Sequence, residues 1–487
     1  MDRRDDLIKS LQLIIEEQLK TIAELRAIIA EQAKTIEQLN NRIALLEERL
    51  AERERSQKLD STNSGKPPSS DGLKKALRVQ SLREKSGKKT GGQPGHEGST
   101  LRQVDDPDLI ERIEAKDCPS CKTDLTNIPV ASIRRRQVFE IPVPVKPVVT
   151  EYHVEVKNCP GCNKQVEASQ EGLQLSAPVQ YGPLTKAVAT YLNVQHLLPL
   201  DRVTKVMAEL FKMPLAEATI ESMVKSCAQN TKTIVEKIED KLKLASVKGA
   251  DESGLRLNGK TLWLHTLCNH KFVHYRISLK RGDIPNILAG TTLVHDHFVS
   301  YYARLSDVLH AVCNAHHLRE LKAVTEIDKE PWARHMARLL CFANHFSQLK
   351  RENINVEWLT RCRKLYDKII AAGLAFHEKL GDLKKSGRGR IKRRPGHNLL
   401  LRLKNRASDV LRFLHDENVP FTNNQSEQAL RMIKVKQKIS GCFRTTSGAE
   451  SFLTVRSYTA TAQKQGHNTF EVLVAAARRA PINFAQA

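Results

Sequence analysis

Apolar residues recur every seven positions over residues 8–50. One heptad position holds Ile8, Ile15, Ile22, Ile29, Ile36, Ile43 and Leu50, and the other holds Leu11, Gln18, Leu25, Gln32, Leu39 and Leu46. Ile at position a with Leu at position d favours a parallel two-stranded coiled coil, whose register the two glutamines help to fix at a cost in stability. A lone amphipathic helix packed on the body fits so sustained a repeat poorly. The pattern predicts a coiled-coil helix over residues 1–56 and hence a homodimer.

Two shorter helical patterns lie before residue 246. DRVTKVMAELFK (201–212) and AEATIESMVKSCA (216–228) are joined by MPL. Two helices with so short a connection have the spacing of a helix-turn-helix DNA reader. The same spacing is more often plain core packing, so both interpretations stay open.

Strand-like patterns begin at residue 246. SVKGADESG predicts a strand that ends at Asp251, and TTLVHD predicts a later one that ends at Asp296. Three further strands are predicted at TLWLHTLC (261–268), FVHYRIS (272–278) and VCNAHH (312–317). Strands followed by helical sequence indicate a mixed α+β fold.

Helical spacing follows over residues 318–380, and one more helix is predicted within PFTNNQSEQALRMIKVKQK (420–438). Asn423 or Asn424 can cap this helix, which then carries Glu427 in its first turn. About 130 residues separate Asp296 from Glu427, more than one strand and a connection need. An inserted helical domain is therefore expected.

Length and charge narrow the class of protein. The chain has 487 residues, a net charge of +23 and a pI near 9.6. An excess of positive charge on this scale indicates a polyanionic partner. The sequence contains no run of about 18 apolar residues, and its start lacks the apolar core of a signal peptide. We therefore expect a cytoplasmic, nucleoid-associated protein without a membrane partner.

Four of the ten cysteines form two C-x-x-C pairs, Cys118 with Cys121 and Cys159 with Cys162. In an intracellular protein such pairs are the tight turns that supply four thiolates to a structural zinc ion. The prolines and alternating residues between them suggest a β-hairpin joining the two knuckles. A redox pair is the weaker alternative, because it leaves the second C-x-x-C unexplained.

Two segments are dense in Lys, Arg and Gly, at 73–98 and 384–397. Both suit contact with DNA phosphates, and a solvated linker or loop is the alternative. Basic residues also follow Glu427 on its helix, where phosphate contact is favoured over a solvated face. The predicted DNA-binding residues are Arg388, Arg390, Lys392, Arg393, Arg394, Arg431, Lys434, Lys436 and Lys438.

Asp251, Asp296 and Glu427 have the placement that a two-metal phosphoryl-transfer site requires. Mg²⁺ prefers carboxylate oxygen, and a pair of ions can activate the attacking oxygen and stabilise the leaving one. Acids at the ends of elements are usually structural, so the spacing alone is modest evidence. Strand alternation turns His295 and His297 away from Asp296 and leaves them without a role. It also turns Glu252 away from Asp251, as an exposed or supporting acid.

The segments GADESG, VHDHFVSY, CNAHHLREL, TNNQSEQALR and IKVKQKISGCFR, in this order, resemble the bacterial transposases of the insertion sequence 66 family. The coiled coil, the NSGKPPSSDG linker and the CPSC and CPGC knuckles also fit that family's plan. Where relatives commonly carry Asp, Ala, Arg and Asp, this chain has Thr422, Ser426, Gln428 and Ala429.

This resemblance implies an RNase H-like core of the DDE type, with Asp251, Asp296 and Glu427 as the three acids around two Mg²⁺ ions. Cys313 and His316 match a C-x-x-H motif that supports the architecture of such sites, although Cys313 can also be a plain core thiol. Asn424 is expected among the supporting residues.

The resulting hypothesis is a DNA transposase that binds the terminal inverted repeats of its element and cuts and transfers strands. Double-stranded DNA and accessory proteins of the same element are the expected partners. Two alternatives remain open: a metal-dependent nuclease that does not join strands, and a dimeric zinc-containing DNA-binding regulator without catalysis.

The predicted architecture is multidomain α+β, with a coiled coil, a zinc-ribbon-like module and an RNase H-like α/β core that carries a helical insertion. In chain order the predicted parts are the coiled coil (1–56), a basic linker (57–104), the zinc module (105–170), the helix-turn-helix-like region (171–245), the first part of the core (246–317), the helical insertion with its basic loop (318–415), and the second part of the core with the C-terminal helices (416–487).

Overall fold

The computed structural model describes residues 2–60, 62–64, 103–139, 145–162, 164–169, 175, 177–349, 351–381, 383 and 391–484. The chain divides into two compact units. The first consists of Met1–Arg78, Gln174–Val203 and Ala216–Ala487, and the second of Val79–Leu173 and Thr204–Leu215. The basic segment 73–98, together with Arg388 and Arg390, lies outside the described residues. No helix in the described part of the chain is long and apolar enough to cross a membrane.

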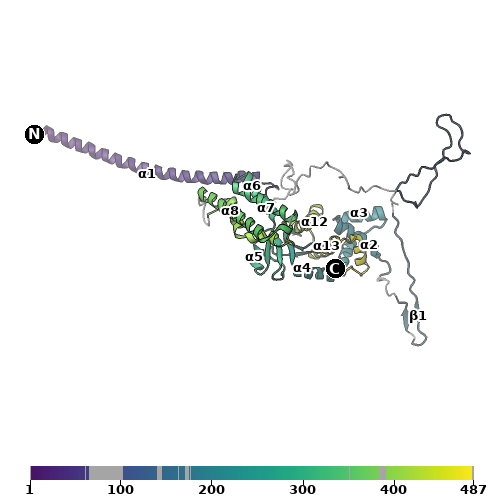
Figure 1. Ribbon diagram of the computed structural model, residues 1–487. Helices are drawn as coiled ribbons and strands as arrows, with labels where there is room; N and C mark the ends of the chain where they lie inside the picture. Colours follow the sequence, from purple (N-terminus) through teal and green to yellow (C-terminus); the bar gives the residue numbers. More distant parts are fainter. Residues whose placement is uncertain are drawn as a thin grey trace. The chain divides into compact units, whose positions relative to one another are not determined.

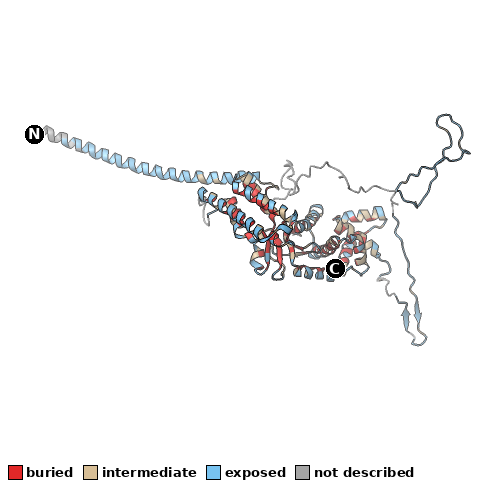
Figure 2. Cartoon of the chain, viewed as in Figure 1, coloured by how far each residue is buried: buried red, intermediate tan, exposed pale blue. Residues whose placement is uncertain are grey.

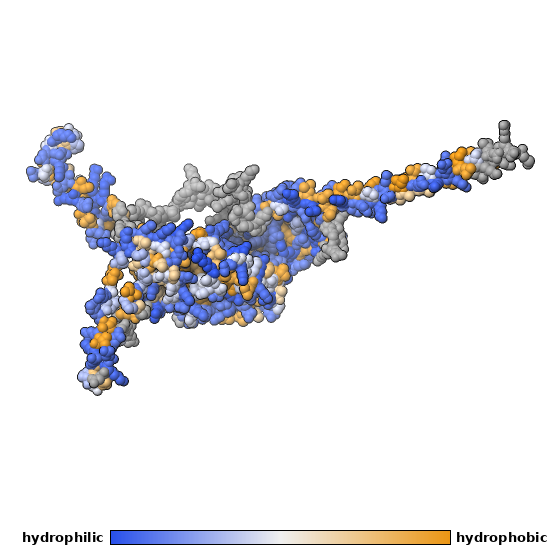
Figure 3. All heavy atoms as spheres, turned by 180° about the vertical axis from the view of Figure 1, so that it is seen from behind, coloured by the Kyte–Doolittle hydropathy of each residue, from blue (hydrophilic) through white to orange (hydrophobic). Residues whose placement is uncertain are grey.

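The N-terminal segment forms one uninterrupted helix, α1 (Asp2–Lys58), of 57 residues. Its heptad stripe is solvent-exposed, with Ile29 at 63% and Leu50 at 58% of full exposure. Figure 2 colours nearly the whole helix as exposed, and Figure 3 shows apolar patches recurring along it. A helix that leaves such a stripe uncovered has its apolar side available to another chain.

The end of α1 is attached to the body of the first unit. Arg55 makes a two-pronged contact with Asp328, with Nε to Oδ1 at 2.8 Å and Nη2 to Oδ2 at 2.9 Å. Lys392 pairs with Glu52 at 3.0 Å. Planar guanidinium–carboxylate contacts fix orientation as well as distance.

Five strands form the sheet of the first unit, in the order β5-β4-β3-β6-β7. Strands β3, β4 and β5 are antiparallel neighbours, whereas β6 and β7 run parallel to β3. Figure 1 shows this sheet among the helices of the body. The strand bounds are β3 Val247–Leu257, β4 Lys260–Cys268, β5 Val273–Ser278, β6 Thr292–His295 and β7 Leu309–Val312.

The structure confirms four of the five predicted strands, whereas the strand predicted at 312–317 is wrong because only Val312 of it belongs to β7. Strand β3 does not end at Asp251, because its pairing with β4 continues through Asp251 opposite Thr266 as far as Leu257. Strand β7 ends at Val312, and the residues after Cys313 begin a helix instead. The apolar residues that predicted this strand lie at its end, and the polar residues after it belong to the first turn of the helix.

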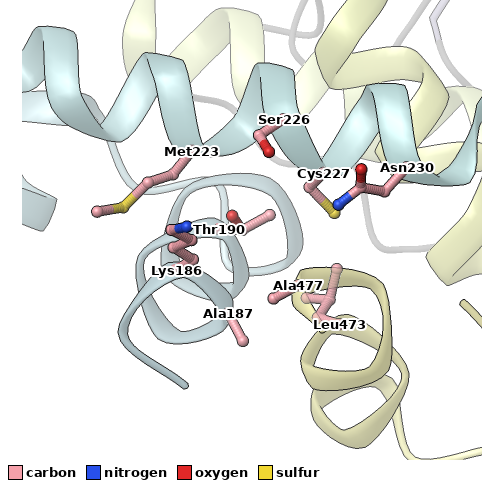
Figure 4. Close-up of a pocket in the computed structure, with 9 residues that line it drawn as sticks. All are labelled: Lys186, Ala187, Thr190, Met223, Ser226, Cys227, Asn230, Leu473 and Ala477. Atoms are coloured by element: carbon pink, nitrogen blue, oxygen red, sulfur yellow. The ribbon is translucent and has the colours of Figure 1, made fainter. Parts of the chain in front are cut away.

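Helices from distant parts of the chain share one core with β3, β4 and β5. They are α2 (Pro183–Thr190), the π-helical turn η2 (Tyr191–Gln195), α4 (Glu217–Leu244), α12 (Asn424–Ser440), α13 (Thr446–Lys464) and α14 (Thr469–Ala477). Figure 4 shows a small pocket where α2, α4 and α14 meet. Beside it Asn230 donates to the Ala476 carbonyl at 2.9 Å, which ties α4 to α14.

The buried Lys248 of β3 also ties α4 to the sheet. Its Nζ donates to the carbonyls of Lys243 and Ala245, at 2.7 and 2.9 Å, where α4 ends. A cation at a helix C-terminus satisfies carbonyls that have no partner within the helix.

The expected helical insertion is present and has its own core, which continues onto β6 and β7. Trp332, Tyr366 and Leu400 are among its buried residues. Its helices are α6 (Asn314–Glu326), α7 (Pro331–Leu349), the short 3-10 turn η3 (Arg351–Asn353), α8 (Val356–Leu380), α9 (Pro395–Asn405), α10 (Ala407–Val410) and α11 (Arg412–His415). A further short helix, α5 (Val299–Arg304), connects β6 to β7.

The second unit contains the two cysteine knuckles and the end of α3 (Leu200–Phe211). Strands β1 (Val156–Asn158) and β2 (Gln165–Glu167) flank the CPGC knuckle as an antiparallel pair. The predicted hairpin joining the knuckles is wrong for its described residues, because none of them forms a strand before Val156, and β1 pairs with β2 around the CPGC knuckle instead. Prolines in that segment lack the N–H that a ladder needs, so pairing is confined to the turn around each knuckle.

Gly249 allows α12 to approach β3 closely. A Cβ on Gly249 would lie 2.5 Å from Ser426 Oγ and 2.6 Å from Asn423 Oδ1. We predict that Gly249→Ala lowers the free energy of unfolding by about 1–3 kcal/mol, because the N-terminal turn of α12 must move away from the strand.

The matched control is Gly254→Ala in the same strand, where the added Cβ meets only Thr261 Cγ2 at 3.8 Å. Urea unfolding of both variants tests the prediction. Equal stabilities for the two would show that the close approach carries no constraint.

Candidate active site

Asp251 lies on the side of β3 that faces α12, since it is two residues from Gly249 along the strand. Burial raises the pKa of Asp251 well above its usual range, and the charges of Asp296, Glu252 and Glu427 raise it further. Asp296 and Glu427 are thus near enough for their charges to act on Asp251, although the three acids come from separate elements. A cluster of carboxylates that repel one another in a buried place is a natural site for divalent cations.

Asp296 follows β6 directly and sits in a tight turn. Its Oδ1 accepts the Phe298 backbone N–H at 3.1 Å, and the next residue, His297, has a φ of 78°. Residues other than glycine rarely adopt this left-handed backbone conformation.

Support for this conformation comes from a chain of histidines for which the sequence suggested no role. His310 Nε2 donates to the Leu305 carbonyl at 3.1 Å, so the Nδ1 of the neutral ring is an acceptor. His310 Nδ1 accepts a hydrogen bond from His295 Nε2 at 3.0 Å. His295 Nδ1 is therefore left to accept the backbone N–H of His297 at 3.1 Å. Burial lowers the pKa of both His295 and His310, in keeping with neutral rings. His295 therefore positions the turn that carries Asp296.

Glu427 lies in the first turn of α12, and Asn423 fixes the start of that helix. Asn423 Nδ2 donates to the Ala250 carbonyl of β3 at 2.7 Å, and its backbone N–H donates to Cys313 Sγ at 3.1 Å. Ser426 Oγ donates to Asn423 Oδ1 at 2.8 Å. Asn424, the residue predicted to support the site, is exposed, and these contacts belong to Asn423 instead.

Cys313 and His316, the two residues of the C-x-x-H motif, both lie beside Glu427. Cys313 Sγ is 3.6 Å and His316 Nδ1 is 3.8 Å from Glu427 Oε1. Cys313 is buried and precedes α6, while His316 lies in its first turn. The two residues connect the helical insertion to the acid on α12.

Glu252 is buried rather than exposed. Its Oε1 accepts from Arg281 Nε and Nη2, at 2.9 and 2.7 Å, and its Oε2 accepts from the Tyr301 hydroxyl at 2.8 Å. Arg281 in turn stacks over Phe298, with its Cζ 4.1 Å from the ring centroid. Because these partners hold both its oxygens, Glu252 supports the fold around Asp296 and is less available than Asp251 to a cation.

The basic residues of α12 divide into two pairs. Arg431 and Lys438 are exposed, in keeping with a contact to phosphates. Lys434 Nζ donates to the Gly254 carbonyl of β3. Lys436 is buried, with its Nζ 4.8 Å from the Phe452 ring centroid, and burial lowers its pKa to about 8. The structure thus places Lys436 among aromatic rings and away from the surface where DNA contact was predicted.

The basic loop is described only from residue 391. Lys392 is exposed and Arg393 is half-buried. Arg394 donates through Nη1 to the Gly381 carbonyl at 2.6 Å, next to the C-terminus of α8. This contact gives Arg394 a structural task in the insertion, whereas Lys392 and Arg393 remain the described candidates for phosphate contact.

In the second unit each C-x-x-C pair forms its own turn. Cys118 N donates to the Thr123 carbonyl, and Cys159 N to the Lys164 carbonyl, each at 2.9 Å. A hydrogen bond from Thr123 lowers the pKa of Cys121 to about 7, and hydrogen bonds from the backbone N–H groups of Gly161 and Cys162 lower the pKa of Cys159. Thiols with lowered pKa values suit a metal ion. The structure does not gather the four sulfurs into one group.

Three segments of the chain match known families. Residues 115–163 match the zinc-finger binding domain of transposase IS66, and residues 12–102 match a family of unknown function, DUF6444. No curated protein matches the chain. Residues 178–451, which hold all three acids together with Cys313 and His316, match the family described as Transposase IS66. That match covers more than half of the 487 residues, and the chain belongs to the IS66 transposase family.

Proposed function

We propose that this protein is a DNA transposase of the DDE type, which binds the terminal inverted repeats of its insertion sequence and cleaves and transfers DNA strands. Two findings support the proposal: the transposase family match over residues 178–451 contains Asp251, Asp296 and Glu427, and the charges of Asp296 and Glu427 help to raise the pKa of Asp251. The three acids come from the middle of β3, the end of β6 and the first turn of α12.

The sheet supports an RNase H-like core. Three antiparallel strands are followed by two strands parallel to the first, in the order β5-β4-β3-β6-β7, with Asp251 on the central strand and Asp296 directly after its parallel neighbour. The helices between β7 and α12 separate the third acid from the others in sequence, yet the charge of Glu427 still acts on Asp251.

Two Mg²⁺ ions suit the three carboxylates, because hard cations prefer oxygen ligands. When bound, such ions activate the attacking oxygen and stabilise the leaving oxygen of a phosphodiester. The protein's own contribution is placement: Asn423 fixes Glu427 against β3, and His295 fixes the turn of Asp296. Phosphoryl transfer asks little more of a protein than such positioning.

The remaining parts suit a DNA-handling dimer in the cytoplasm, at the nucleoid. The exposed heptad stripe of α1 is proposed to pair with a second copy as a coiled coil. The zinc-finger domain is proposed to bind zinc through Cys118, Cys121, Cys159 and Cys162. This domain is proposed to contact or position DNA, together with the exposed Arg431, Lys438 and Lys392. Accessory proteins of the same element are further candidate partners.

Replacing any one of Asp251, Asp296 or Glu427 with Ala should reduce Mg²⁺-dependent cleavage of element ends by at least about 10³-fold. Each change removes several kcal/mol of transition-state charge stabilisation. Mapping nicks on labelled element ends measures the loss. The variants should still bind those ends. As a control, Asp307→Ala, which removes an exposed acid, should cleave normally.

Full cleavage by one of the three variants would remove that residue from the proposed triad. Cleavage without joining of pre-cut ends would indicate a nuclease, and binding without any Mg²⁺-dependent change to DNA would indicate a regulator.

Asp251→Asn should raise the melting temperature in chelator at pH 7–8. The folded-state pKa of Asp251 is raised, so its ionisation destabilises the folded chain as pH rises through that pKa. Added Mg²⁺ should stabilise the wild type more than Asp251→Asn. The advantage of the variant should vanish below the ordinary Asp pKa, where both states bind the proton.

Thermal unfolding with and without Mg²⁺ measures both effects, with Asp307→Asn as the control. An equal Mg²⁺ response in wild type and Asp251→Asn would contradict the assignment of Asp251 as a metal ligand.

Ile29→Lys should convert the dimer to monomer at micromolar concentration, because it places a charge in the heptad seam. Ala27→Lys lies two residues away and outside both heptad positions, so it should stay dimeric. Light scattering of the two full-length variants distinguishes them. A monomeric wild type would rule out dimerisation through α1.

A further inference from the structure

One group of metal-capable side chains in the described part of the chain has all its ligand atoms within 4.8 Å of one another. It consists of Cys313, His316 and Glu427, which offer one sulfur, one nitrogen and one oxygen. The first two come from the start of α6 and the third from the first turn of α12. Two separate helices therefore present a mixed set of donors to one point.

These donors are those of zinc rather than magnesium. Zinc binds Cys sulfur at about 2.3 Å and His nitrogen or carboxylate oxygen at about 2.0–2.2 Å, so two ligands of a tetrahedral ion lie roughly 3.4–3.6 Å apart. Cys313 Sγ is 3.6 Å and His316 Nδ1 is 3.8 Å from Glu427 Oε1. Two of the three ligand pairs are thus close to tetrahedral spacing, and the third pair lies within 4.8 Å.

The surroundings of His316 point to a missing ligand. Its Nδ1 is shielded from solvent and has no hydrogen-bond partner among the described residues. A polar nitrogen left in that condition costs free energy, which a bond to a cation would recover. The side chains of His316 and Glu427 keep 29% and 21% of their exposure, so an ion and a water ligand can reach them.

Cys313 is also prepared to act as a ligand. Its sulfur accepts the backbone N–H of Asn423 at 3.1 Å, an interaction that persists when the thiol loses its proton to a metal. Hydrogen bonds of this kind orient and stabilise metal ligands from outside the coordination sphere.

We propose that Cys313, His316 and Glu427 form a zinc site that competes with the proposed magnesium site for Glu427. On binding, the Cys313 thiol releases its proton to solvent, and the sulfur, His316 Nδ1 and a Glu427 oxygen each donate an electron pair to the ion. Zinc bound there withdraws Glu427 from Asp251 and Asp296 and inhibits catalysis. The binding stands on the geometry of the three side chains, and the inhibition rests on the proposed function.

Magnesium cannot replace zinc at this site, because it rejects thiolate and demands nearly octahedral oxygen ligands. Glu427 is the one residue common to both sets. The zinc site therefore acts as a switch between a resting and a competent arrangement of the same carboxylate.

The experiment measures tightly bound zinc in the full-length chain by metal analysis after desalting. The wild type is expected to hold one zinc ion per chain more than Cys313→Ser and one more than His316→Gln. Cys341→Ser, which changes an exposed thiol in the same way, should match the wild type. Cobalt substitution should give a thiolate-to-metal absorption band in the wild type that is weaker in Cys313→Ser.

Equal zinc content in wild type, Cys313→Ser and His316→Gln would overturn the proposal. Because His316 is partly exposed, His316→Gln serves as the test if Cys313→Ser fails to fold.

A second arm adds micromolar zinc to Mg²⁺-dependent cleavage of element ends. Zinc should inhibit the wild type at least about 10-fold, and His316→Gln should lose that sensitivity in whatever cleavage it retains. Zinc binding without any cleavage would refute the proposed function and leave the zinc site standing. Cleavage by a wild type that lacks the extra zinc ion would refute the zinc site and leave the proposed function standing.

Discussion

The site depends on a single buried amide, that of Asn423, which joins three elements that are far apart in sequence. Its side chain holds α12 against the Ala250 carbonyl of β3, and its backbone reaches the Cys313 sulfur before α6. Buried polar groups are stable only when they are paired, so these contacts admit few alternative positions for the start of α12. Gly249 completes the constraint, because only a residue without a side chain leaves room for Asn423 and Ser426.

Ser426 adds to this anchoring. Its hydroxyl donates to Asn423 Oδ1 and lies 3.2 Å from Cys268 Sγ of β4, so the residue adds a link between α12 and the sheet. An alanine at that position could make neither contact.

Alternation and helical spacing predicted most of the strands and helices, because these patterns report burial directly. The assignment of Asp251, Asp296 and Glu427 as the catalytic acids stays a prediction, since acids near the ends of elements are common and spacing alone does not distinguish a metal ligand from a structural acid. The sequence did not reveal the roles of His295 and Asn423, because the partners of both lie across tertiary contacts that no local pattern records. Lys436 shows the same limit: its spacing is that of a surface lysine, and only the packing of Phe443 and Phe452 places it inside.

The attachment of α1 has a consequence for a cell that makes several copies of this protein, some of them defective. A helix of 57 residues is about 85 Å long, and Arg55 clamps its end to the body that holds the acids. If pairing depends on that helix alone, a copy that has lost one of the three acids by mutation still pairs as well as an intact copy. Defective copies in the same cell would then sequester intact partners in inactive mixed pairs, so that decay of some copies restrains the activity of the rest.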